Sequence, residues 1–165
     1  MQGAKLLTAL TLSTLVLGSA QASEVIRHKI PNSDFPIAQA VEIPADKTVV
    51  HLSGTVPSQI NPKADPNSVE AYGDMEAQTL SVLKAIEANL KGLGLNMGDV
   101  YRMQVFLVGD PEKNGAVDFD GFMRAYTQYF GTKEQPNLPV RSAVEVAELV
   151  NPGWLVEIEV SAVRP

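Results

Sequence analysis

Two amphipathic segments set among short β-branched ones constrain the fold of this chain most strongly. The first covers residues 75–91, with Asp74 as its candidate N-cap and Gly92 as its candidate C-cap. Its apolar residues recur at three- and four-residue steps: Leu80, Leu83, Ile86 and Leu90. The second covers residues 119–130 and ends at Gly131. Its apolar face consists of Phe119, Phe122, Met123, Tyr126 and Phe130. Both periods predict helices that bury one side against another layer.

Short segments rich in β-branched residues, bounded by Pro, Asn, Asp and Gly, are predicted to be strands. They cover residues 25–30, 38–43, 48–52, 100–108, 142–149 and 154–163. The order β-β-β-α-β-α-β-β predicts an α+β fold, with one mixed sheet and two helices on one of its faces. The turn Asn151-Pro152-Gly153 predicts that the last two strands form a hairpin. Residues 57–73 are predicted to be a surface loop, long enough to cover a site.

Residues 1–22 have the three parts of a secretory signal peptide. Lys5 and the amino terminus supply positive charge, residues 6–17 are mainly apolar, and Ala20-Gln21-Ala22 fits the small-x-small cleavage rule. The apolar stretch is shorter than a bilayer-spanning helix requires. We therefore expect cleavage after Ala22 and export to the periplasm or the medium. The mature chain, residues 23–165, would be one domain without membrane attachment.

Composition excludes several classes of function. The chain has no cysteine, so disulfides, thiolate metal sites and cysteine nucleophiles are excluded. A formal net charge of −6 disfavours binding to nucleic acid or to anionic membranes. His28 and His51 are the only imidazoles, and no carboxylates can be placed with them, so we expect no metal site. The glycines at 92, 94 and 98 lack the spacing of a phosphate-binding loop.

Alternation along residues 155–162 separates two faces of the last strand. Val156, Ile158, Val160 and Ala162 form an apolar face that is suited to meet the helices. The opposite, helix-free face would carry Leu155, Glu157, Glu159 and Ser161, joined on the partner strand by Arg141, Ala143, Glu145 and Ala147. Such a face would be exposed to solvent on a monomer and partly buried in a ring of subunits. There Arg141 could pair with a carboxylate or bind an anionic ligand.

The C-terminal segments PVRSAVEVAEL (139–149) and VEIEVSAV (156–163) resemble the Rid/YjgF family of reactive-intermediate deaminases. Older names of that family include liver perchloric-acid-soluble ribonuclease and translation inhibitor. Further matches occur in the same order: Ala38-Gln39-Ala40, Leu52-Ser53-Gly54, Gln78, and residues 94–100. The resemblance covers nearly all of residues 23–165. The ribonuclease activity attributed to parts of the family finds no basic, aromatic-interleaved patch here.

The resemblance implies a chorismate-mutase-like subunit that assembles as a homotrimer with three inter-subunit clefts. Active members hydrolyse enamines and imines of amino acids to 2-keto acids and ammonia, without a cofactor. By resemblance, Arg141 of the P-x-R-S segment would hold the substrate carboxylate. Glu157, the first glutamate of the E-I-E segment, would orient or activate water, and Ser53 would line the cleft.

Two positions depart from the family pattern. A tyrosine of the family aligns with Ile37, and an asparagine of its second helix aligns with Met123. Ile37 and Met123 are therefore expected to line the substrate site, which keeps its anion anchor and loses polar groups. The departures favour either a bulkier, more apolar ligand or a lower hydrolase activity.

Two functions remain open on this basis: an exported imine or enamine deaminase, and a non-catalytic trimer that binds a small carboxylate in the periplasm. Each site residue also has a structural alternative. Arg141 could form an interface ion pair with Glu157 or Glu145. Glu157 could be a solvated carboxylate, and Ser53 could be a turn residue.

Overall fold

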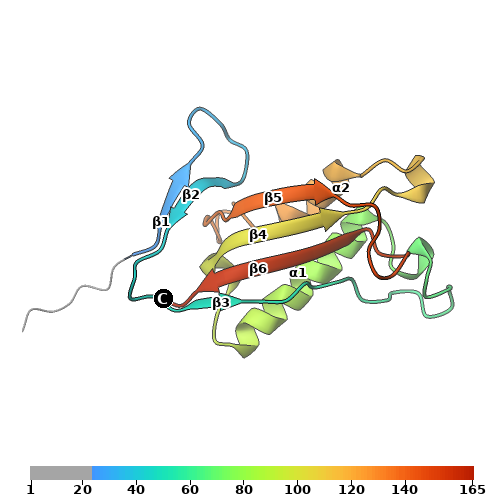
Figure 1. The fold of residues 1–165 in the computed structure, drawn as a ribbon, viewed down its shortest axis with the longest axis horizontal. Helices are drawn as coiled ribbons and strands as arrows, with labels where there is room; N and C mark the ends of the chain where they lie inside the picture. Colours follow the sequence, from blue (N-terminus) through green and yellow to red (C-terminus); the bar gives the residue numbers. More distant parts are fainter. Residues whose placement is uncertain (1–23) are drawn as a thin grey trace, which may run out of the picture.

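Four strands form a mixed sheet, and both helices cover one of its faces (Figure 1). The computed structural model describes residues 24–165. The strands are β3 (Val49–His51), β4 (Val100–Leu107), β5 (Val140–Glu145) and β6 (Val156–Val163), in the spatial order β3-β6-β4-β5. The helices are α1 (Met75–Gly92) and α2 (Phe119–Tyr126). Strand β4 runs parallel to β5 and antiparallel to β6. The predicted α+β architecture with a mixed sheet is confirmed.

The first two strands form a hairpin of their own beside the sheet. Among residues 24–165, strands β1 (Ile26–Lys29) and β2 (Ala38–Glu42) pair only with each other, so they form a second sheet where a single sheet was expected. The hairpin is joined to the start of β5, because the Ala38 N–H donates to the Pro139 carbonyl at 2.9 Å. The Arg27 guanidinium also donates to the carbonyls of Gly98 and Val100. The expected signal peptide, residues 1–22, and the expected mature terminus at residue 23 lie outside the described residues.

The ends of α1 follow local capping chemistry. The Asp74 carboxylate accepts from the Ala77 N–H at 2.9 Å, so the predicted N-cap is confirmed. The predicted C-cap at Gly92 is wrong, because Gly92 is the last helical residue. Gly94 adopts the left-handed conformation (φ +72°) and donates to the Lys91 carbonyl, while Leu95 donates to the Leu90 carbonyl. These two bonds form a Schellman motif, in which the left-handed residue lies beyond the helix.

Helix α2 ends earlier than its apolar pattern predicted. Beyond Tyr126, the amides of Gln128 and Tyr129 bond three residues back instead of four, so residues 127–130 form turns. Phe130 stays buried in these turns, and Gly131 (φ +74°) ends the segment. In the described part of the chain, three short 3₁₀ helices complete the regular structure: Val69–Ala71, Met97–Asp99 and Pro111–Lys113.

The predicted hairpin between the last two strands is wrong. The turn at Asn151 is present, since the Trp154 N–H donates to the Asn151 carbonyl at 3.0 Å. However, β4 lies between β5 and β6. The segment between the two strands therefore crosses the end of β4, and β5 runs parallel to β4 instead of antiparallel to β6. The helix-facing register Val156, Ile158, Val160 and Ala162 is confirmed, because all four are buried in the core.

The face assigned to Arg141 changes with the strand pairing. Arg141 pairs in register with Met103, a core residue, and therefore points toward the helix side of the sheet. Ala143 and Glu145 share that side by alternation. Leu155 was also expected on the open face, yet it precedes β6 and is fully buried. The prediction that Arg141 and Glu157 share the helix-free face is wrong.

The loop of residues 57–73 packs against the turn at 151–153. The Asn151 amide donates to the Pro66 carbonyl at 2.9 Å, and the Tyr72 hydroxyl donates to the same carbonyl. A Cβ on Gly153 would lie 2.5 Å from the Ser68 carbonyl oxygen, so only glycine fits this contact. In Figure 1 the loop lies at the end of the sheet remote from β1 and β2. No helix within residues 24–165 combines the length and apolar character that a membrane crossing requires.

Candidate functional site

Arg141 lies in a cage of aromatic rings and a thioether. Its guanidinium carbon is 4.3 Å from the centroid of the Tyr126 ring and 5.1 Å from that of Phe122. The rings of Phe35 and Phe119 follow at 5.5 and 5.9 Å. Its Nη1 atom lies 3.4 Å from the sulfur of Met123. Ring faces stabilise a cation without neutralising its charge.

The Arg141 charge has no carboxylate partner in the described part of the chain. Residues 24–165 contain four ion pairs, and none includes Arg141. Arg141 therefore forms no ion pair with Glu157 or Glu145 inside the described part of one chain, and the expected pair across a subunit interface stays a prediction. Burial lowers the pKa of the guanidinium, and the charge interaction and hydrogen bond with the Tyr126 side chain oppose this shift. Because an arginine stays protonated in proteins, the site presents a partly desolvated cation.

Tyr126 also fixes the segment before β2. It is fully buried, and its hydroxyl donates to the Pro36 carbonyl at 2.8 Å. Burial raises the pKa of this hydroxyl, so it stays protonated as the donor. The bond holds Pro36 beside α2 and places Ile37 at a cavity of about 490 Å³. The cavity is lined by Ile30, Ile37, Ala38, Gln39, Arg102, Met103, Val140, Arg141 and Ser142.

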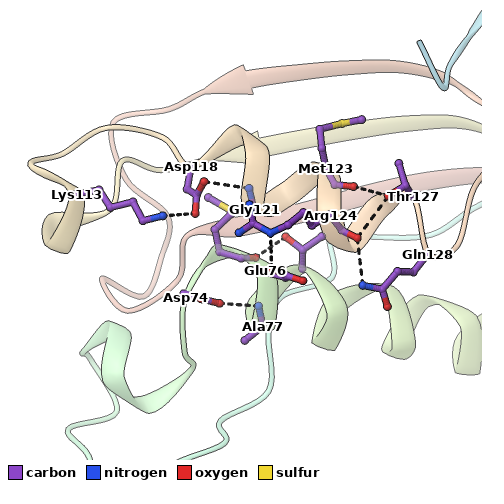
Figure 2. Close-up of polar contacts among 12 residues, drawn as sticks. Asp74, Glu76, Ala77, Lys113, Asp118, Gly121, Met123, Arg124, Thr127 and Gln128 are labelled. Carbon is purple, nitrogen blue, oxygen red and sulfur yellow. Dashed lines mark hydrogen bonds and ion pairs between the residues drawn. The ribbon is translucent and has the colours of Figure 1, made fainter. Parts of the chain in front are cut away.

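Polar contacts hold α2 against the start of α1 (Figure 2). The Asp118 carboxylate caps α2 by accepting from the Gly121 N–H at 3.0 Å, and Lys113 donates to the same carboxylate. The hydrogen bond from Lys113 lowers the pKa of Asp118. Farther along α2, Arg124 donates to Glu76 of α1 at 2.6 Å. Together they fix the helix that carries Met123 and Tyr126 to the guanidinium.

Glu157 belongs to a second cluster, with Ser53 and Gly54. A Cβ on Gly54 would lie 1.8 Å from the Glu157 Oε1 atom, so the carboxylate rests against the glycine backbone. Thr55 and Ile158 exchange backbone hydrogen bonds at 2.9 and 3.0 Å, which holds the two segments together. Ser53 lines a neighbouring cavity of about 480 Å³ beside the C-terminal turns of α1. Its other lining residues are Leu52, Gly54, Thr55, Ala88, Asn89, Gly92 and Leu93.

One chain does not bring the two clusters together. Arg141 pairs with Met103, which pairs with Val160, whereas Glu157 pairs with Phe106. The two residues are thus two strands apart, three residues apart along the register, and on opposite faces of the sheet. From strand spacing, their Cα atoms lie about 14 Å apart. The structure therefore unites Arg141, Met123 and Ile37 in one cluster, and Ser53 and Glu157 in another.

The two histidines occupy separate places. His28 of β1 lies 2.7 Å from the Glu42 carboxylate on β2, and His51 of β3 lies 2.8 Å from the Ser161 hydroxyl on β6. Among residues 24–165, no group of three or more histidine and carboxylate side chains is placed to hold a metal ion.

Sequence reasoning missed three features of these clusters. Phe35, in a predicted turn, gave no signal of its contact with Arg141. Tyr126 was placed on an apolar helix face, and its hydroxyl was the signal that it needs a buried acceptor. The close approach of Gly54 to Glu157 was also missed. A glycine at the end of a strand pattern is the signal for such a contact.

Comparisons with known proteins agree on one family. Residues 23–164 match the model of the family described as endoribonuclease L-PSP. The 2-iminobutanoate/2-iminopropanoate deaminase of Salmonella typhimurium is 30% identical over 134 residues, which cover 81% of this chain and 91% of that protein. The solved YjgF gene product of Escherichia coli is 30% identical, with a TM-score of 0.55 over 87% of this chain and 100% of that one. The E. coli protein TdcF, solved with bound serine, is 27% identical, with a TM-score of 0.55 over 87% and 99% of the two chains.

Proposed function

The chain belongs to the endoribonuclease L-PSP (Rid/YjgF) family and has its chorismate-mutase-like α+β fold, and on this premise we propose that it is a hydrolytic deaminase. Its substrates are reactive imines or enamines derived from amino acids, and its products are 2-keto acids and ammonia. The name of the Salmonella relative supports the reaction class at 30% identity.

The observation that carries the proposal is the partly buried guanidinium of Arg141 without a carboxylate partner. A carboxylate can accept two parallel hydrogen bonds from a guanidinium, and such bonds are among the strong ones in proteins. The aromatic cage leaves the positive charge available to an incoming anion. A 2-imino acid carries the required carboxylate next to its reactive carbon. Binding of the carboxylate to Arg141 therefore holds that carbon at a nearly constant distance from the guanidinium.

The reaction needs one water molecule for each imine. The water oxygen bonds to the imine carbon, the carbon–nitrogen bond breaks, and the nitrogen leaves as ammonia while a keto group forms. Glu157 acts as the water-handling group, because its carboxylate can accept a proton from the attacking water and return it to the leaving nitrogen. Ser53 lines the same half of the cleft.

Separation of the two clusters makes a homotrimer part of the proposal. Arg141 and Glu157 lie on opposite faces of one sheet, so one chain cannot apply both groups to one substrate. In a ring of three subunits, Arg141 of one subunit can face Glu157 of the next, which forms three equivalent clefts. Substrate binding and the water-handling group would then come from different chains.

Subunit mixing tests this arrangement. Arg141→Ala and Glu157→Ala chains with different tags are co-expressed, and mixed oligomers are isolated through both tags. Each parent oligomer should be nearly inactive, whereas every mixed trimer should hold one intact cleft in three and regain about a third of the wild-type rate. Imines are generated in situ by an amino-acid oxidase, and their loss is followed as a decrease in semicarbazone. Fully inactive mixed oligomers of trimeric mass would contradict the shared cleft, and a monomeric mass at micromolar concentration would contradict the trimer.

The alternative, a non-catalytic trimer that binds a small carboxylate, is favoured by one observation. Four aromatic rings and the Met123 thioether surround the Arg141 cation, and Ile37 and Met123 add no hydroxyl or amide to the site. Wild-type protein that binds 2-keto acids without accelerating imine loss would establish this alternative. An Arg141→Ala protein that both binds and turns over as the wild type does would contradict both functions.

Export is the remaining part of the proposal. The pattern of residues 1–22 supports a cleaved signal peptide and a periplasmic or secreted location. The full chain expressed in a Gram-negative host should be recovered from the periplasmic fraction, and its mass should be that of a chain that starts at Ser23. Recovery of the uncleaved chain from the cytoplasm would contradict it.

A further inference from the structure

We propose that the substrate carries a large apolar side chain, so that it is the 2-imino acid of an aliphatic or aromatic amino acid larger than alanine. This inference rests on the proposed function, because it takes Arg141 as the carboxylate anchor. It identifies Phe35, Phe119 and Met123 as the residues that set specificity.

The parts of the Arg141 cage that a ligand can reach are apolar. Phe122 and Tyr126 are fully buried behind the guanidinium. Phe35 is 42% exposed, whereas Phe119 and Met123 are half-buried. The Phe35 and Phe119 rings lie 5.5 and 5.9 Å from the guanidinium carbon. A carboxylate bound there brings the substituent on its neighbouring carbon against these three side chains.

The cavity beside Arg141 has a mixed lining with an apolar part. Ile30, Ile37 and Val140 contribute to its lining, and its volume of about 490 Å³ lies within the usual range for small-molecule sites. Besides Arg141, its polar lining residues are Gln39, Arg102 and Ser142, and of these Arg102 already donates to Gln104 at 3.0 Å. An apolar side chain gains about fourfold in affinity for each buried methylene group. A polar one would lose hydration against Phe35 and Met123 without a compensating hydrogen bond.

Competition between two imines measures the preference. The leucine-derived and alanine-derived 2-imino acids are generated in situ, and kcat/KM is determined for each with wild-type protein. The leucine-derived imine should be favoured by at least about tenfold. Met123→Asn should lower this ratio about tenfold, because it places an amide against the substrate side chain. Met123→Leu, the matched control, should keep the ratio within about twofold.

The outcomes separate this inference from the proposed function. A wild-type preference for the alanine-derived imine, or none, would overturn the inference while hydrolysis itself stands. Equal ratios in Met123→Asn and Met123→Leu would remove Met123 as a specificity residue. Full activity of Arg141→Ala would overturn the proposed function instead. If the wild type hydrolyses neither imine, the inference is tested by calorimetry. The affinities for 4-methyl-2-oxopentanoate and pyruvate, the 2-keto acids of leucine and alanine, are compared. Binding of the branched keto acid tighter by about tenfold or more supports it, and equal or weaker binding overturns it.

Discussion

The buried amide of Gln78 holds α1 to the segment that leads into β6. Its Nε2 atom donates to the carbonyls of Gly73 and Gly153 at 2.8 and 2.9 Å, and its Oε1 atom accepts from the Leu155 N–H at 2.8 Å. The side chain is fully buried. Leu155 precedes Glu157 by two residues, so this amide also supports the strand end that carries the proposed water-handling group.

Replacement of Gln78 by leucine should destabilise the protein severely. Leucine has a side chain of similar size but no amide, so three backbone groups lose their hydrogen bond to Gln78. Each unsatisfied buried group costs about 1–3 kcal/mol, so the loss of three such bonds should lower the free energy of unfolding by about 3–9 kcal/mol. That is a large fraction of the roughly 5–15 kcal/mol that stabilises a typical domain.

Urea unfolding at one fixed protein concentration measures this loss. With a denaturant slope of about 2 kcal/mol per molar, the unfolding midpoint should fall by about 1.5–4.5 M. The matched control is Thr79→Val at the next position. The Thr79 hydroxyl is equally buried and donates to the Met75 carbonyl, which lies within α1, so its loss should cost less than about 1 kcal/mol. Hydrogen exchange at the Leu155 amide should accelerate only in the Gln78 variant. A Gln78→Leu midpoint as high as that of Thr79→Val would refute the reasoning.

Two further substitutions test the two clusters. Gly54→Ala should displace the flexible Glu157 carboxylate, which lies where the new Cβ would be, and lower imine turnover by about tenfold or more with little change in the urea midpoint. Gly92→Ala, which meets no atom within 4 Å, is its control, and equal turnover in both variants would contradict the role of Glu157. Tyr126→Phe should lower stability by about 1 kcal/mol at neutral pH. Because the folded pKa of Tyr126 is raised, its contribution is present below its unfolded pKa of about 10 and is lost as the pH rises above that value. Urea midpoints between pH 7 and 11 should therefore fall more steeply in the wild type than in Tyr126→Phe, and parallel curves would contradict this cause.

Local chemistry in the sequence determined the elements and several of their ends. The apolar steps of α1, the Asp74 cap and the alternation of β6 each depend on residues near one another in the chain, so their patterns carried the prediction. The motif around Arg141 and the resemblance it supports likewise identified the family. The C-cap was misplaced by one residue: it is Leu93, and the left-handed glycine that follows it is Gly94, which only backbone geometry distinguishes from Gly92.

Only the tertiary structure decided which strands pair, and with them the site. The Asn151-Pro152-Gly153 turn has the sequence of a hairpin, yet β4 lies between β5 and β6. A turn fixes the direction of the chain over a few residues, whereas strand pairing is set by the burial of all strands under both helices. That pairing moved Arg141 to the helix side, under Tyr126, and left Glu157 on the opposite face. Side-chain direction in a sheet depends on register, which no local pattern in β5 specifies.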